Sequence, residues 1–205
     1  MESKLLPLFP LDLVLLPGIP LPLHVFEPRY KEMIGECLAG KTGFGVVRAK
    51  DEEGIAEIGC TAEILTVTKE YDDGRMDIVT QGRERFEIVT VNHERAFLQA
   101  EVLYLIDDSA PPTREEGAEA LKLHNEILSL AGAALEKLQP DEDPQLSFHL
   151  AGTLPLDLDF KQTLLEMKSE GERVRALISY LQTILPDLRR TVHIRQKAGG
   201  NGHAH

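Results

Sequence analysis

Cysteine is scarce in this 205-residue chain, and the scarcity excludes two classes of architecture. The two cysteines, Cys37 and Cys60, cannot form a disulfide framework or a four-thiolate zinc site. Cys37 falls in a helical pattern and Cys60 in an alternating strand pattern, so both are expected to be buried thiols. A reducing cytoplasm is the compartment that suits this composition.

Basic residues are also in the minority, because 22 Lys and Arg stand against 34 Asp and Glu, a formal net charge of −12. A surface of that sign repels phosphate backbones, which disfavours broad nucleic-acid binding. A long uninterrupted apolar run is missing too. The apolar beginning has Glu2 beside Lys4 and no small-residue cleavage site, so it is not expected to be a secretory signal. It is also too short and too proline-rich to cross a bilayer, so no membrane contact is expected.

Proline is abundant in one place, between Leu6 and Tyr30. This apolar segment contains six prolines: Pro7, Pro10, Pro17, Pro20, Pro22 and Pro28. Each proline fixes φ near −65° and removes a backbone donor. The segment is therefore expected to be a poor central strand, with a tight turn at Pro17-Gly18.

The chain up to residue 110 otherwise shows one helix followed by short strands. The helix is predicted from Pro28 to about Leu38. The strands that follow are predicted at Phe44–Ala49, Ile55–Lys69, Met76–Thr80, Phe86–Val91 and Phe97–Ile106, with a hairpin turn at Asp72–Gly74. This spacing predicts a small, mostly antiparallel barrel or sandwich.

Residues 111–188 are predicted to be a separate helical subdomain of four helices. The first runs from a capping box at Thr113 and Glu116 to about Leu138. The others are predicted to begin near Asp143, Asp159 and Ser169, and the last is expected to stop at Pro186. Residues 189–205 are predicted to be a disordered tail.

Residues Gly35 to Thr42 match the phosphate-binding pattern of a glycine, four residues and Gly-Lys-Thr. A phosphate site needs a strand before this loop and a helix after it, since the helix N-terminus supplies the amides. Here the predicted helix precedes the loop and a strand follows. The helix C-terminus would repel a nucleotide, so nucleotide binding is not predicted.

No other catalytic pattern is present. The seven histidines have no metal-ligand spacing, and His124 lies on an apolar helix stripe that indicates the core. No serine stands in a Gly-x-Ser-x-Gly elbow. The sequence therefore predicts no catalytic residues, no metal site and no cofactor, and hence no enzyme.

Three stretches carry a resemblance to a known family. They are the proline-rich segment Leu6–Tyr30, the strand Ile58–Ile64, and the run Gln81–Phe86. In this order they resemble the Lon N-terminal, or substrate-binding, domain family, over roughly residues 5–186. The resemblance implies an α+β fold, with a PUA-like, mostly antiparallel β-barrel, one early helix, and a C-terminal four-helix subdomain. The resemblance is to a stand-alone member of the family, because 205 residues leave no room for the ATPase and protease modules of Lon proteases.

The resemblance implies a non-catalytic polypeptide-binding module. Its partners would be unfolded or partly folded polypeptides, or a protease or quality-control protein that it serves as an adaptor, and weak homo-oligomers are compatible with this role. The alternative is a PUA-like module for nucleic acid or a small molecule, with Arg48, Arg83 and Arg85 as a local basic patch.

Candidate binding residues follow from the proline-rich segment and the Gln81–Phe86 run. Four apolar side chains are candidates for the wall of a groove, and two arginines are candidates for polar anchors: Leu16, Ile19, Leu21, Phe26, Arg29 and Arg83. In the competing structural interpretation, the charged residues around Pro28 and after Gly82 pair with one another or with loop amides.

Overall fold

The computed structural model describes residues 5–50, 54–108, 110–140 and 142–200. The chain divides into two compact units. One contains Met1–Asp107 together with Ala151–Lys168, and the other contains Asp108–Leu150 together with Ser169–His205. Within the described residues, no helix is long and apolar enough to cross a membrane.

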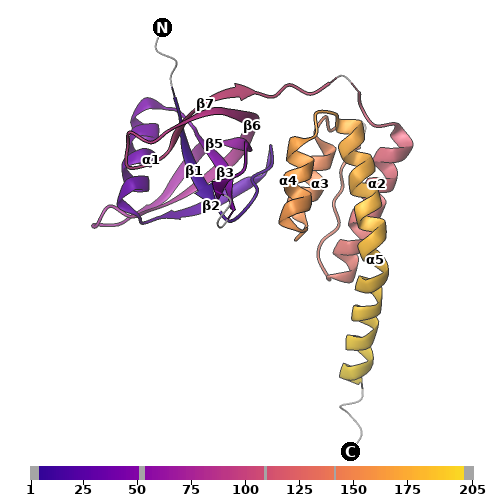
Figure 1. Cartoon of the computed structure of the whole chain (residues 1–205). Coiled ribbons are helices and arrows are strands. Elements are labelled where there is room, and N and C mark those ends of the chain that lie inside the picture. The colour runs from indigo at the N-terminus through magenta and orange to yellow at the C-terminus, as the bar shows by residue number, and fades with distance from the viewer. Residues whose placement is uncertain (1–4, 51–53, 109, 141, 201–205) are drawn as a thin grey trace, which may run out of the picture. The chain divides into compact units, whose positions relative to one another are not determined.

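The first unit is built on a closed β-barrel (Figure 1). Its strands are β1 (Leu6–Leu11), β2 (Pro20–Val25), β3 (Phe44–Lys50), β4 (Gly54–Ile55), β5 (Ile58–Glu70), β6 (Met76–Asn92) and β7 (Gln99–Tyr104). The order around the barrel is β1-β7-β6-β5-β3, and a parallel β1–β3 pairing closes it. β2 pairs with β6, and β4 pairs with β3. All other pairings are antiparallel, so the predicted α+β fold with a mostly antiparallel barrel is confirmed.

The prediction that the proline-rich segment makes a poor central strand is wrong for β1. This strand pairs on both edges, with β3 and with β7, although it contains Pro7 and Pro10. The ladder with β7 covers only two residue pairs, so few donors are needed there. β2 follows the expected rule, because Pro20 and Pro22 lie on a strand that pairs only with β6.

The helix α1 (Pro28–Gly40) begins with proline in its first turn, as predicted. It buries Tyr30, Met33, Ile34 and Cys37, and Lys41 ends it in the left-handed conformation at φ 50°. β3 comes after the loop. The Gly35–Thr42 motif therefore lies at a helix C-terminus, which confirms the inverted order that argues against a phosphate site.

The barrel core brings together the sequence stretches that carry the family resemblance. Leu8, Val47, Phe86 and Ala100 form one buried cluster. A Cβ atom at Gly59 would lie 2.7 Å from the Phe86 ring and 2.5 Å from the Val46 carbonyl oxygen. Gly59, in the Ile58–Ile64 stretch, is therefore needed to leave room for the ring of Phe86, in the Gln81–Phe86 stretch. Phe86 in turn packs in one cluster with Leu8 of β1.

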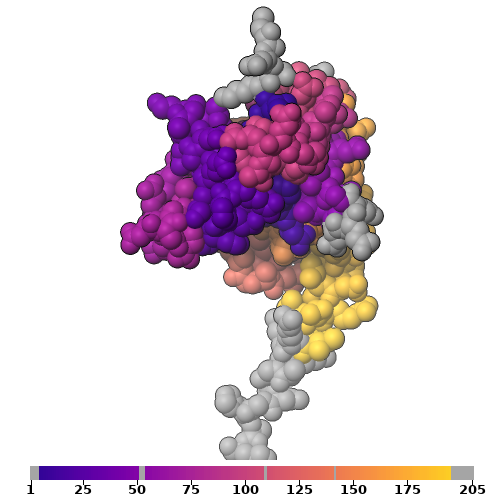
Figure 2. All heavy atoms as spheres, turned by 60° about the vertical axis from the view of Figure 1, so that its left-hand side comes forward, coloured from indigo at the N-terminus to yellow at the C-terminus, as the bar shows by residue number. Residues whose placement is uncertain are grey.

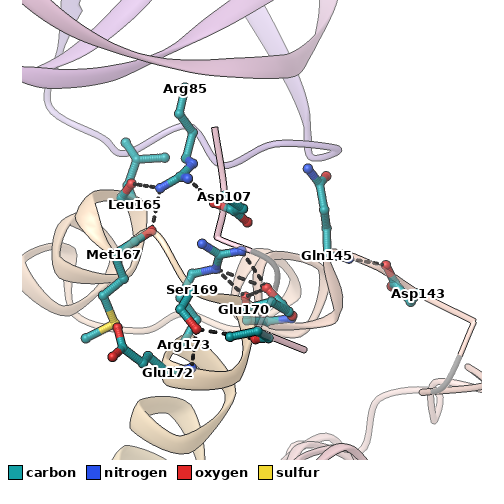
Figure 3. Close-up of polar contacts among 12 residues, drawn as sticks. Arg85, Asp107, Asp143, Gln145, Leu165, Met167, Ser169, Glu170, Glu172 and Arg173 are labelled. Carbon is teal, nitrogen blue, oxygen red and sulfur yellow. Dashed lines mark hydrogen bonds and ion pairs between the residues drawn. The ribbon is translucent and has the colours of Figure 1, made fainter. Parts of the chain in front are cut away.

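Residues 151–168 belong to the barrel unit, which differs from the predicted boundary at residue 110. They contain the end of α3 (Leu146–Thr153) and the whole of α4 (Leu158–Glu166). Gln162 Nε2 donates to the Ile58 carbonyl at 3.1 Å. Arg85, buried on β6, donates to the Leu165 carbonyl at 2.7 Å and the Met167 carbonyl at 2.5 Å, and pairs with Asp107 (Figure 3). These bonds satisfy carbonyls at the end of α4 that have no partner inside the helix.

The second unit packs α2 (Arg114–Leu130) beside α5 (Glu170–Gly200) (Figure 1). The predicted capping box at Thr113 and Glu116 is present. α2 ends eight residues before the predicted Leu138 because Gly132 takes φ +71° and the Ala133 amide bonds back to the Leu128 carbonyl. His124 is fully buried, as its place on the apolar stripe predicted.

α5 corrects the expected end of the fold. Pro186 lies inside this helix, so the predicted stop there is wrong. Residues 189–200, predicted as part of a disordered tail, continue the helix, and 201–205 lie outside the described residues. A proline is accommodated at an exposed helix position at the cost of one backbone hydrogen bond and a bend.

A buried polar cluster joins the start of α5 to α3 within the second unit (Figure 3). Glu170 accepts from the Ser147 amide at 2.7 Å and forms an ion pair with Arg173 at 2.7 Å. The Arg173 guanidinium also lies 4.3 Å from the centre of the Phe148 ring. Because these side chains are buried, the loss of one partner would leave a lone buried charge, which is strongly destabilising.

Candidate functional site

The barrel unit carries an open groove of about 1520 Å³. It is lined by the start of β1, the last turns of α1 with the following loop, the first half of β5, two parts of β6, the loop between β6 and β7 at Arg95, and most of β7. Figure 2 shows one face of this unit, with the indigo start of the chain beside the rose-coloured residues near 100, which pair with β1. Grooves on barrels are common sites for ligands.

Large apolar side chains are exposed in this groove. Val89 on β6 and Leu103 and Tyr104 on β7 have exposed fractions of 56%, 61% and 52%. Leu5 and Leu6 add half-buried apolar surface from the beginning of β1. Large apolar side chains that remain exposed in one groove are typical of a place where a partner binds.

Charged side chains border the apolar surface in paired form. Arg95 donates to Glu36 at 2.5 and 2.7 Å and to Glu32 at 2.6 Å. The hydrogen bond from Arg95 lowers the pKa of Glu36, and the same two glutamates raise the pKa of Arg95. On the β5–β6 side, Arg83 Nε donates to Glu63 at 2.5 Å. The two arginines of the groove therefore have carboxylate partners of their own.

The four predicted wall residues are distributed over separate environments. Leu16 is buried in the core, with 1% of its surface exposed. Ile19 packs against α3, where a Cβ at Gly152 would lie 2.2 Å from its Cδ1. Leu21 lies on β2, and its carbonyl accepts from the Thr80 hydroxyl. Phe26 is exposed, and its ring stacks on His24 with 5.9 Å between the ring centres. None of the four lines the groove.

The two predicted anchors have different positions. Arg29 pairs with Glu27 at 2.8 Å and lies over the Tyr30 ring, away from the groove lining. Arg83 lines the groove. The structure therefore places one of the six candidate residues in this groove and keeps Leu16 out of reach of any ligand.

The proline-rich segment and Gly82 meet in a backbone contact. The Gly18 amide donates to the Gly82 carbonyl at 2.9 Å, and the Gly82 amide donates to the Ile19 carbonyl at 3.0 Å. A Cβ at position 82 would lie 2.2 Å from the Leu16 carbonyl oxygen. The expected turn at Pro17-Gly18 is confirmed, with Gly18 at φ +77°. These residues thus hold the barrel together.

The exposed apolar residues of the groove were missed by reasoning from the sequence. A signal for them exists, because Val102–Ile106 is a continuous apolar run, and a half-buried strand would alternate. Apolar side chains on both faces of β7 leave Leu103 in water on the outer face. A continuous apolar run of this length is also typical of a strand that is buried on both faces. Only the closure of the barrel shows that β7 has one face in water.

Chemistry at the groove is limited by the nature of its side chains. The cysteine in the lining, Cys37, is buried, and its thiol donates to the Gly43 carbonyl at 3.6 Å. In the part of the chain that the structure describes, no group of three or more His, Cys, Asp or Glu side chains could hold a metal ion. The arrangement of apolar surface and paired charges is suited to binding.

Comparison with known proteins agrees with the architecture. Residues 5–183 match the model of the ATP-dependent protease La (LON) substrate-binding domain. A Lon protease of Cytophaga hutchinsonii is 25% identical over 94% of this chain and 26% of its own length. A Lon protease of Parabacteroides distasonis is 30% identical over 64% of this chain and 17% of its own length. The chain thus spans about a quarter or less of the curated relatives it matches.

A solved structure supports the same assignment. The Lon N-terminal domain protein from Xanthomonas campestris superposes with a TM-score of 0.71 at 27% identity, over 87% of this chain and 99% of that protein. The N-terminal domain of a Mycobacterium avium complex Lon protease shares the fold, with a TM-score of 0.69. The family model covers well over half of the sequence, and the closed barrel with its appended helices is the fold of these neighbours. The chain therefore belongs to the ATP-dependent protease La (LON) substrate-binding domain family.

Proposed function

We propose that this protein is a non-catalytic polypeptide-binding module that recognises unfolded or exposed apolar segments. The observation that carries the proposal is the open groove in which Val89, Leu103 and Tyr104 are more than half exposed. Burial of such side chains against a partner would be favourable by about 25 cal/mol per Å² of apolar area. The bound segments would be delivered to a protease or another quality-control protein, so the module would act as an adaptor.

A nucleic-acid role is disfavoured by the state of the three arginines that would form a basic patch. Arg85 is buried and binds two carbonyls and Asp107. Arg48 pairs with Asp159 at 2.5 Å, and Arg83 pairs with Glu63. With a net charge of −12, the surface offers phosphates little attraction.

The test compares two exposed leucines of the same protein. Leu103 lies in the groove, whereas Leu135 is exposed in the helical unit, at 54%. A fluorescently labelled, permanently unfolded polypeptide is titrated with the native chain and with Leu103→Ser and Leu135→Ser. We expect the Leu103→Ser variant to bind about five- to tenfold more weakly, in line with the loss of one buried leucine contact. Equal affinities of the two variants would contradict the groove as the binding site.

The same titration tests Phe26, the candidate wall residue that is exposed but lies outside the groove. Phe26→Ser removes an exposed ring without disturbing the core. If Phe26→Ser weakens binding and Leu103→Ser does not, the polypeptide binds beside the β2–α1 junction instead.

A further inference from the structure

The loop between β6 and β7 is joined to α1 by the side chain of Arg95. This arginine donates to both carboxylate oxygens of Glu36, at 2.5 and 2.7 Å, and to Glu32 at 2.6 Å. Within the described residues, all hydrogen bonds between this loop (residues 93–98) and α1 come from the Arg95 guanidinium. Glu36 and Arg95 both line the groove, so this contact joins two parts of its wall.

The Arg95 guanidinium also covers an aromatic ring. Its central carbon lies 4.5 Å from the centre of the Phe97 ring, a distance at which the cation is attracted to the ring face. Phe97 is 2% exposed and does not line the groove. The Arg95 side chain is 34% exposed and does line it. The guanidinium is therefore the layer that separates the ring from the groove.

Two glutamates hold the guanidinium over the ring, and they hold it weakly. Glu32 and Glu36 are four residues apart on α1, where like charges repel each other, and Arg95 relieves that repulsion. The two glutamate side chains are 48% and 51% exposed, so water and salt screen their attraction to the arginine. The covered arrangement is therefore favoured in the free protein, and a bound partner needs little energy to displace the arginine.

Arg83 provides a comparison within the same groove. Its Nε donates to Glu63 at 2.5 Å, and its side chain is 45% exposed. In the described part of the chain, no aromatic ring lies against the Arg83 guanidinium. Loss of Arg83 would remove an exposed ion pair from the groove and would uncover no ring. The two arginines therefore separate the effect of a charge from the effect of a cover.

We infer that Arg95 is a displaceable cover over a specificity subsite, in which the ring of Phe97 receives a large apolar side chain of the bound polypeptide. This inference rests on the proposed polypeptide binding and adds a preference to it. Movement of the guanidinium into water uncovers the ring, and an apolar side chain that takes its place removes apolar area of both partners from water. A segment without a large apolar side chain gains nothing from this movement and leaves the cover closed.

The binding test uses two short, uncharged peptides that differ at one position. Both carry apolar residues for the groove, and the central residue is Phe in one and Ala in the other. Binding to the full chain and to its variants is measured by fluorescence anisotropy. We expect Arg95→Ala to bind the Phe peptide about fivefold more tightly than the native chain does, and the Ala peptide equally, because the ring is then permanently uncovered. Arg83→Ala should leave both affinities unchanged.

Salt provides a second measurement on the native chain. Sodium chloride at about 300 mM screens the ion pairs of Arg95, so the native chain should bind the Phe peptide more tightly than it does at low salt. Arg95→Ala, which has no such ion pairs, should not respond. Because both peptides are uncharged, their own electrostatic attraction to the chain does not enter the comparison.

The cover itself is tested by fluorescence. The chain contains no tryptophan, so Phe97→Trp introduces a single fluorophore beneath the guanidinium. Acrylamide should quench this fluorophore weakly, and severalfold more strongly when Arg95→Ala is added, whereas adding Arg83→Ala should change nothing. If circular dichroism shows that Phe97→Trp does not fold, the peptide comparison alone decides.

The outcomes separate the subsite from the proposed function. Equal gains of affinity for the Phe and Ala peptides in Arg95→Ala, or no gain for either, would overturn the subsite. Weaker binding of both peptides by Arg95→Ala would also overturn it, because the arginine would then be a contact for the polypeptide. Failure of both peptides to bind the native chain and every variant would instead contradict the proposed function.

Discussion

Arg85 and Arg83 lie two positions apart on β6 in opposite environments. The Arg85 side chain is 4% exposed and binds two carbonyls and Asp107, whereas Arg83 is about half exposed and pairs with Glu63. Removing Arg85 leaves buried acceptors and a carboxylate without their donor, so Arg85→Ala is expected to lower the free energy of unfolding by about 3 kcal/mol or more. Arg83→Ala is expected to cost less than about 1 kcal/mol. Urea denaturation of both variants is the measurement, and similar midpoints would contradict the assigned role of Arg85.

Gly82 and Gly35 offer a second comparison between single residues. A methyl group at Gly82 meets the Leu16 carbonyl at 2.2 Å, whereas one at Gly35 on α1 meets nothing within 4 Å. Gly82→Ala is expected to be destabilising by about 2 kcal/mol or more through displacement of the proline-rich turn. Gly35→Ala is expected to raise stability by up to about 1 kcal/mol, because alanine is the better helix former. A thermal unfolding midpoint that falls for Gly82→Ala and rises for Gly35→Ala would support both predictions. A higher midpoint for Gly82→Ala would contradict the close contact with Leu16.

The Cys60 thiol gives a prediction that depends on pH. Its pKa rises from 9.0 to about 12 in the folded protein because burial penalises the thiolate. The folded state therefore holds this proton more tightly than the unfolded state, and the associated stability is complete below pH 9 and is lost as pH rises toward 12. In a Cys37→Ser variant, Cys60 should resist iodoacetamide at pH 8.5 and react at once in concentrated urea. Rapid alkylation of the folded variant would show that the thiol is accessible.

At the scale of elements, α5 contains an unfavourable residue in its interior. Pro186 lacks the amide that an interior helix position donates, which typically costs about 3 kcal/mol. Pro186→Ala should therefore increase the helicity measured by circular dichroism and delay thermal unfolding of the helical unit, whereas Gln182→Ala, also exposed on α5, should change little. If Pro186→Ala lowered helicity, the helix would have to end before this residue.

Local sequence signals predicted most elements, and they failed where long-range contacts decide. Pro28, the Thr113–Glu116 capping box and the Asp72–Gly74 turn each act within a few residues, and each is where the pattern placed it. Gly132 is also a local signal, for the end of α2. It was overlooked because the apolar stripe continues past it to Leu138. The pairing of β1 on both edges and the membership of α4 in the barrel unit were not expected, because both depend on residues far along the chain. The groove is lined by β1, β5, β6 and β7 together, and no local residue pattern encodes which strands come side by side.

At the scale of the whole molecule, the net charge of −12 leads to a prediction about partners. We expect the chain to pass through a heparin column at low salt, and to bind unfolded polypeptides of positive net charge more tightly than negative ones. Because the attraction is electrostatic, the difference should shrink as ionic strength rises from 50 to 300 mM, where the Debye length falls to about 6 Å. Retention on heparin that persists at low salt would favour the nucleic-acid alternative.

The discontinuous make-up of the barrel unit has a consequence for the protein while it is being synthesised. The Leu165 carbonyl, which accepts from Arg85, is synthesised 80 residues after it. Likewise β1 can pair with β7 only after the strands between them have been synthesised. A nascent chain that has emerged only as far as Asp107 holds the strands β1 to β7 but lacks α4. Its Arg85 would be a buried cation without its carbonyl partners, and Ile58 would lack the Gln162 amide. A ribosome-bound intermediate of this length should therefore be protease-sensitive, and resistance should appear only after Lys168 has left the exit tunnel.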